Sequence, residues 1–178
     1  LDFSDPILTN VTISNNMAEY YGGGMRLSNS NPILTNVTIS NNTATSGGGG
    51  MRLSSSNPTL TNSIIWGNSP ESIYISSGTP LITYSDIEGG WEGEGNIDDN
   101  PQFTDPDNGD YTLMETSPCI DTGTIIEDME YCGDAPDMGA FEYCEEQVLS
   151  GDLNGDGLIN VLDVVALVNI VLGNSDPI

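Results

Sequence analysis

The chain has 178 residues, of which 37% are hydrophobic, enough for a modest buried core. Twenty-seven acidic residues against two basic ones give a formal net charge of −25, so nucleic acids and anionic membranes are poor partners. Divalent cations suit this charge, although solubility in salty surroundings explains the acidity equally well. The sequence has no apolar run of about 18 residues, so no membrane insertion is expected.

The first half of the chain repeats one short sequence. Residues 31–42 (NPILTNVTISNN) recur with one change at 5–16, and in weaker form at 57–68 and 80–87. The prolines of these copies stand at positions 6, 32, 58 and 80, so the steps are 26, 26 and 22 residues. A fixed period of this size is typical of a solenoid, in which each copy forms one coil.

Each copy carries apolar residues at alternate positions, which predicts a strand with one buried face. A second strand is expected at Met25–Leu27, Met51–Leu53 and Ile73–Ile75, each of which begins seven residues before the next proline. The shorter step must therefore have lost its four residues in a turn, because only the strands have to stay in register. The apolar positions of the first strand are Leu8, Leu34, Leu60 and Ile82, then Ile13, Ile39, Ile65 and Ile87.

Coils of this length leave room for several short strands and their turns. The expected fold class is all-β, a right-handed parallel β-helix over residues 1–95, with a small C-terminal calcium loop-helix element. A leucine-rich repeat has an overlapping period, but its Leu-x-x-Leu-x-Leu pattern is missing. Recurring asparagines predict ladders, in which side-chain amides bond the backbone and one another from coil to coil. The ladder residues are Asn10, Asn36 and Asn62, and then Asn16, Asn42 and Asn68.

Two further features of the coils concern single side chains. Arg26 and Arg52 lie one period apart, so they should stack on one face and pair with acids such as Glu19. Asn41 begins an Asn-x-Thr pattern, which can accept a glycan in an exported protein. The same pattern at two ladder asparagines has a structural explanation, which leaves Asn41 as the candidate glycosylation site.

Residues 88–100 break the period with glycine and acid, and a series of short motifs follows. These motifs are NPQF (100–103), NGDYTL (108–113), SPCIDTG (117–123) and DMGAFEY (137–143). Together with the coils, their order resembles bacterial surface β-helix proteins that carry a closing segment called choice-of-anchor Q. The resemblance implies that residues 96–143 close and cap the β-helix ahead of a sorting or anchoring element. Such a cap needs a polar outer face.

Three cysteines cannot all pair within one chain. A disulfide between Cys132 and Cys144 would staple the end of the fold, and Cys119 is expected as a small buried hydrophobic residue. Three free thiols in a reducing compartment are the alternative. We favour one disulfide and an extracellular or cell-surface location.

Residues 144–150 form a short link to the strongest chemical motif of the chain. In residues 152–163 (DLNGDGLINVLD), oxygen-bearing side chains occupy loop positions 1, 3, 5 and 12, and glycine occupies position 6. A seven-coordinate Ca²⁺ loop requires this pattern, and a plain loop rich in Asp and Asn is the alternative. The expected ligands are Asp152, Asn154, Asp156, the backbone carbonyl of Leu158, Asn160 through a water molecule, and Asp163.

No helix precedes this loop, and its position 12 is Asp, so residues 151–174 resemble one calcium repeat of a dockerin. The resemblance implies a docking or assembly element. A dockerin carries two such repeats, however, and the positions that contact cohesin hold Val161 and Leu162 here, so cellulosomal cohesin is not the expected partner. The helix expected at about Val161–Leu172 is apolar on nearly every side and must be buried against something.

No catalytic constellation is expected in this chain. Acids at positions 86, 88, 92 and 94 cluster near Trp91, but they lie in a glycine-rich loop, and glycoside hydrolysis needs two carboxylates at a set separation. The near uniformity of the first coils also argues against an enzyme, because a catalytic site interrupts a repeat.

The expected function is a secreted or cell-surface, calcium-binding structural or adhesive module that could serve as a fibre subunit. It would bind a protein partner, or a second copy, through its C-terminal helix and its open N-terminal coil, and a polysaccharide is a further candidate ligand. The alternative is the non-catalytic C-terminal part of an extracellular polysaccharide-degrading enzyme that is attached through a dockerin.

Overall fold

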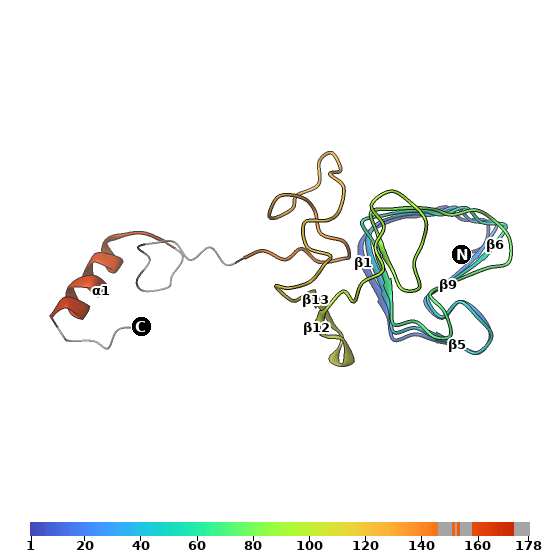
Figure 1. Ribbon diagram of the computed structural model, residues 1–178, viewed down its shortest axis with the longest axis horizontal. Coiled ribbons are helices and arrows are strands. Elements are labelled where there is room, and N and C mark those ends of the chain that lie inside the picture. Colours follow the sequence, from blue (N-terminus) through green and yellow to red (C-terminus); the bar gives the residue numbers. More distant parts are fainter. Residues whose placement is uncertain (146–150, 152, 154–157, 173–178) are drawn as a thin grey trace. The chain divides into compact units, whose positions relative to one another are not determined.

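The computed structural model describes residues 1–145, 151, 153 and 158–172, and the chain divides into two compact units, residues 1–144 and 145–178 (Figure 1). The first unit contains a stack of coils and a segment packed beside them. The coil strands are β1 (Ile7–Ser14), β2 (Met17–Ala18), β3 (Met25–Ser28), β4 (Ile33–Ser40), β5 (Thr43–Ala44), β6 (Met51–Ser54), β7 (Thr59–Thr61), β8 (Ile64–Trp66), β9 (Ile73–Ile75), β10 (Leu81–Thr83) and β11 (Asp86–Ile87). Beside them lie β12 (Phe103–Asp105), the 3-10 turn η1 (Pro106–Asn108) and β13 (Asp110–Leu113).

The strands of successive coils pair in parallel and in the predicted register. Ile7 pairs with Ile33, Ile33 with Thr59 and Thr59 with Leu81, which confirms the steps of 26, 26 and 22 residues. β1 joins the sheet β10-β7-β4-β8-β11 through β4, while β3-β6-β9 and β2-β5 form two further sheets. The second strand of each coil is also confirmed, since β3, β6 and β9 begin at the expected residues.

The shortened coil has lost its residues at one corner. Ser69 still bridges to Thr43 and Ile73 still pairs with Met51, so eight positions in one coil correspond to four in the next. The sheet formed by β2 and β5 therefore has only a single bridge to the third coil.

Each coil has corners at which a residue adopts the left-handed backbone conformation. At the corner within the longest strands, Asn10, Asn36 and Asn62 have φ angles of 55°, 51° and 51°, and Tyr84 takes the same position with 48°. Asparagine tolerates this region better than most residues with a side chain. The repeated asparagines are therefore suited to the backbone of the corner itself.

Apolar side chains fill the interior of the coils. The core includes Leu34, Val37 and Ile39 of the second coil, all fully buried, and equivalent residues of the coils that follow. In the first coil, the equivalent residues Leu8, Val11 and Ile13 are only partly buried. Within the described residues, the first coil pairs with a neighbouring coil on one side.

Residues 88–98, here called the end loop, cover the last coil. Trp91 packs against the coil core, the N–H of Tyr84 donates to the Glu94 carbonyl, and that of Ile97 donates to the Ser85 carbonyl. The end loop therefore continues the solenoid by part of a turn, and closes it with an aromatic side chain.

Residues 99–144, here called the lateral segment, pack against the outer face of the coils beside β1, β4 and β8 (Figure 1). The N–H of Gly139 donates to the Asn62 carbonyl, and that of Ala140 donates to the Thr38 hydroxyl. Residues 96–143 were predicted to close and cap the β-helix: residues 96–98 lie in the end loop over the last coil, and the later ones lie beside the coils. A second core holds Ile64, Phe103, Tyr111, Leu113, Cys119 and Met138.

The second unit contains, among its described residues, the helix α1 (Val161–Val171), close to the predicted range. Asn160 caps it: its side-chain oxygen accepts from the Leu162 N–H at 2.7 Å, while the Asp163 carboxylate accepts from the Asn160 N–H at 2.7 Å. Within the described part of the chain, no helix combines the length and hydropathy needed to cross a membrane.

Candidate functional site

One of the two predicted asparagine ladders runs through the inside of the coils. The Asn42 side-chain oxygen accepts from both the backbone and the side-chain N–H of Asn16, each at 3.0 Å. The Asn68 oxygen accepts from the same two groups of Asn42, at 2.9 and 3.1 Å. Each amide nitrogen also donates to a neighbouring carbonyl, for example from Asn42 to Ile13. The Asn42 and Asn68 amides are buried, and each uses both its oxygen and its nitrogen in stabilising the stack.

The other predicted ladder, Asn10, Asn36 and Asn62, is not a ladder of amides. The Asn36 side-chain oxygen is buried and accepts no hydrogen bond, so it cannot receive one from a neighbouring asparagine. Asn62 instead binds the lateral segment, because its side chain donates to the Thr124 carbonyl at 2.9 Å and accepts from the Thr124 N–H at 2.8 Å. These three residues share a left-handed backbone, which explains their repetition.

The candidate glycosylation site, Asn41, faces the lateral segment. Its amide nitrogen donates to the Tyr111 hydroxyl at 3.4 Å, beside an equivalent bond of 3.1 Å from Asn15. Tyr111 is almost fully buried, so it links two coils to the lateral segment. A glycan on Asn41 would have to displace this contact, which argues against the modification.

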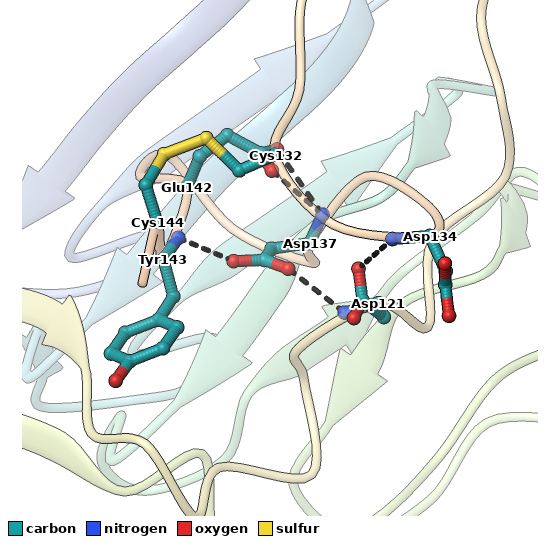
Figure 2. The surroundings of a disulfide bond; sticks show 7 residues. All are labelled: Asp121, Cys132, Asp134, Asp137, Glu142, Tyr143 and Cys144. Atoms are coloured by element: carbon teal, nitrogen blue, oxygen red, sulfur yellow. Dashed lines mark hydrogen bonds between the residues drawn. A yellow bond between two sulfur atoms is a disulfide. The ribbon is translucent and has the colours of Figure 1, made fainter. Parts of the chain in front are cut away.

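The lateral segment is closed by the disulfide Cys132–Cys144, whose Cα atoms lie 5.4 Å apart (Figure 2). Cys119 is a buried free cysteine. Both features match the pattern expected from the sequence. The disulfide fixes a loop without strands. This loop contains residues 137–143, the last of the short motifs that follow the coils.

Acidic side chains beside this disulfide bind backbone amides. Buried Asp137 accepts from the N–H groups of Asp121 and Tyr143 at 2.8 and 2.6 Å, and Glu142 accepts from the Asp137 N–H at 3.1 Å (Figure 2). Burial raises the pKa of Asp137 and that of Glu142 above their usual values. The acids of these motifs therefore shape the loop, and their oxygens are already occupied.

Asp86 and Cys119 form a buried pair where β11 meets the lateral segment. The thiol donates to Asp86 Oδ2 at 3.4 Å, and the Asp99 N–H donates to Asp86 Oδ1 at 3.3 Å. Burial raises the pKa of Asp86 to about 7, although its two hydrogen bonds oppose this shift. Burial and the nearby Asp86 carboxylate also raise the pKa of the Cys119 thiol, which disfavours a reactive thiolate.

The acids proposed as a cluster near Trp91 do not converge on one point. Asp86 binds the lateral segment, Glu88 accepts from the Gly67 N–H at 2.8 Å, and Glu94 accepts from the Tyr84 hydroxyl at 2.9 Å. Each of these three carboxylates therefore binds a different partner near the last coil. The arrangement does not resemble two carboxylates that flank one substrate bond.

The two arginines pair side by side in β3 and β6, as predicted from their spacing. Among the described residues neither arginine forms the expected ion pair with Glu19, and Arg52 lies over the ring of Tyr21 at 4.4 Å from its centroid. Tyr21 in turn stacks on Tyr74, with ring centroids 5.9 Å apart. A cation over aromatic rings keeps its charge while covering apolar surface.

Only part of the predicted calcium loop can be described. Asp152, Asn154 and Asp156 lie outside the described residues, whereas Leu158, Asn160 and Asp163 lie within them. The buried Asp163 carboxylate accepts from the Leu153 N–H at 2.8 Å and from the Asn160 N–H at 2.7 Å. The last position of the loop is therefore tied to its second position. Within the described residues, no group of three or more His, Cys, Asp or Glu could hold a metal ion.

Comparison with known proteins agrees with the coil geometry. A family model described as "Right handed beta helix region" matches residues 2–102, which is more than half of the chain. No curated protein and no solved structure matches the chain. The matched residues contain all the strands of the coils and the end loop. The chain belongs to the right-handed β-helix family.

Proposed function

We propose that the chain is an extracellular or cell-surface, calcium-binding structural module that docks a protein partner through its C-terminal loop-helix element. The observation that carries this proposal is the surface of α1. The apolar side chains that it exposes are Val161, Leu162, Val164, Val165, Leu167, Val168 and Val171. A helix with this surface is stable in water only when another surface covers part of it, so we assign it to docking.

Calcium would fix the loop that leads into this helix. Asp152, Asn154, Asp156, the Leu158 carbonyl, Asn160 and Asp163 would hold the ion, as inferred from their spacing. When bound, Ca²⁺ would neutralise the negative charge that these side chains concentrate. Asp163 supports this role because its carboxylate is buried and joins the loop to the first turn of α1.

The coils would act as a stiff carrier rather than as an enzyme. The buried carboxylates of the first unit bind backbone amides or a thiol, and the buried ladder amides of Asn42 and Asn68 bond to neighbouring coils. The Cys132–Cys144 disulfide supports an oxidising, extracellular location. A second copy of the chain is a further candidate for the docking partner, through the first coil.

Calcium titration of the whole chain by calorimetry tests the proposal. We expect one ion to bind, and Asp163→Asn to weaken binding at least about tenfold while it keeps an acceptor for the helix cap. Glu127→Gln, which neutralises an exposed acid outside the loop, is the matched control. Absence of binding in millimolar Ca²⁺ would remove the metal from the proposal.

Docking is tested separately by sedimentation velocity over a range of protein concentrations, with and without Ca²⁺. We expect the chain to associate with itself or with a partner. Val165→Asp in α1 should abolish this association. An unaltered monomer whose helix remains fully exposed and helical by NMR would contradict the docking role.

A further inference from the structure

The third coil departs from the repeat at the end of β8. The first two coils read Ser-Asn-Asn at residues 14–16 and 40–42, whereas the third reads Trp66-Gly67-Asn68. Asn68 keeps its place in the ladder, so the departure affects only the two residues before it. Trp66 remains half-buried against the lateral segment, and a Cβ at Gly67 would lie 2.5 Å from the Asn41 amide oxygen. Glycine suits the left-handed backbone of this position, where φ is 67°, and leaves room for that oxygen.

This departure coincides with a cleft of about 470 Å³ between the coils and the lateral segment. Trp66 and Asn41 lie on the coil side. Asn100, Gln102, Asp107 and Met114 lie on the side of the lateral segment. Both walls belong to the first unit, and the hydrogen bonds that the Tyr111 hydroxyl accepts from Asn15 and Asn41 hold them together.

The polar groups of the cleft have hydrogen-bonding capacity to spare. Asn41 uses its amide nitrogen on Tyr111, Asn100 uses its oxygen on the Gln102 N–H, and the Gln102 oxygen is taken by Thr116. The Asn41 oxygen, the Asn100 and Gln102 nitrogens and the Asp107 carboxylate make no bond within the described residues. The cleft thus offers two donors and two acceptors around one large aromatic ring.

We propose that this cleft binds a neutral oligosaccharide, with Trp66 against the apolar face of one sugar ring. A pyranose ring has a face of C–H groups and a rim of hydroxyls that both donate and accept, which matches an aromatic platform beside mixed amides and a carboxylate. An acidic saccharide fits poorly, because the chain has a net charge of −25 and Asp107 lies in the cleft.

The site goes beyond the structural role proposed above and does not depend on it, because no calcium-loop residue lines the cleft. The test therefore uses the full 178-residue chain in the presence of a chelator. Cellohexaose, xylohexaose and mannohexaose serve as neutral probes, and trigalacturonate serves as the charged comparator. Binding is followed by calorimetry and by ligand-observed NMR.

We expect at least one neutral probe to bind, and Trp66→Ser, which restores the residue of the earlier coils, to weaken it at least about tenfold. Asp107→Asn should weaken it by a factor of about two to ten. This variant also serves if Trp66→Ser does not fold, because the Asp107 carboxylate makes no bond within the described residues. Tyr20→Ser removes an exposed aromatic ring outside the cleft and should change nothing.

Three results would overturn the proposal. They are failure of every neutral probe at millimolar concentration, binding of trigalacturonate alone, and binding that survives both cleft variants unchanged. Loss of calcium binding by the C-terminal loop would leave the result in chelator unaltered, so the two proposals can fail independently.

Discussion

The thiol of Cys119 donates to the buried carboxylate of Asp86 at 3.4 Å, across the junction between the last coil and the lateral segment. The two residues are 33 positions apart in the chain, and both are fully buried. Burial makes the charged form of Asp86 costly, although this hydrogen bond partly offsets the cost, so Asp86 contributes to the pH dependence of the stability of the fold.

Asp86→Asn should stabilise the protein at neutral and alkaline pH relative to the wild type. Burial raises the pKa of Asp86 from 3.8 to about 7, so this group favours the folded state most below pH 4 and loses that contribution as the pH rises to 7. The difference in unfolding free energy between variant and wild type should therefore grow over this range, with an upper bound of about 4 kcal/mol.

Urea denaturation of both proteins at pH 4.5 and pH 8 measures this difference. Asp137 and Glu142, whose pKa values burial also raises, are present in both proteins and cancel. Glu92→Gln removes an exposed carboxylate and should show no such pH dependence. If the difference in unfolding free energy between Asp86→Asn and the wild type is the same at both pH values, Asp86 is not a buried carboxylate that becomes charged over this range.

Cys119 should be unreactive toward thiol reagents in the native protein. Its pKa is raised and its side chain is fully buried, so neither the thiolate nor the access that reaction requires is present. A colorimetric thiol assay should count none in the native state, one after denaturation without reductant, and three after reduction. Three thiols before reduction would show that the Cys132–Cys144 disulfide does not form.

The two sets of asparagines should respond differently to the same substitution. Asn36→Gly keeps the backbone at a position where φ is 51° and removes an amide oxygen that accepts nothing, so a cost of about 1 kcal/mol or less is expected. Asn42→Gly removes the acceptor for Asn16 and the donor to Ile13, so about 3 kcal/mol is expected. Equal costs in chemical denaturation would contradict the assignment of separate roles.

Tyr111→Phe should destabilise the first unit by about 1 kcal/mol, because the amides of Asn15 and Asn41 lose their shared acceptor. Hydrogen exchange should speed up first at the N–H groups of the lateral segment that bind the coils, such as that of Ala140. Tyr131→Phe, at a partly exposed ring, is the control. Unchanged exchange in Tyr111→Phe would show that its hydroxyl does not hold the segment in place.

The coils could be predicted because their signal is repeated. Leu34, Leu60 and their equivalents occupy the same step of each copy, and any other register would expose them. The role of Asn10, Asn36 and Asn62 was ambiguous in sequence, since asparagine suits both an amide ladder and a left-handed corner. Only the backbone angles separate these two uses.

The position of the lateral segment could not be derived from its motifs. One signal was present, because Ile64, Ile65 and Trp66 interrupt the alternation of apolar and polar residues. Ile65 faces the coil core and Ile64 the second core, as expected of a strand covered on both sides. The partners on that outer face come from residues 103–138, and no local pattern connects them with β8.

The lateral segment changes how the solenoid should respond to a pulling force. A stack whose coils touch only their nearest neighbours can lose coils one at a time from an end. Here the segment is bonded to every coil in turn, through Asn15, Thr38, Asn62 and Asp86. A pulling force applied along the stack would be shared by four attachment points instead of concentrating at the weakest coil. The coils should therefore unfold together, in one event.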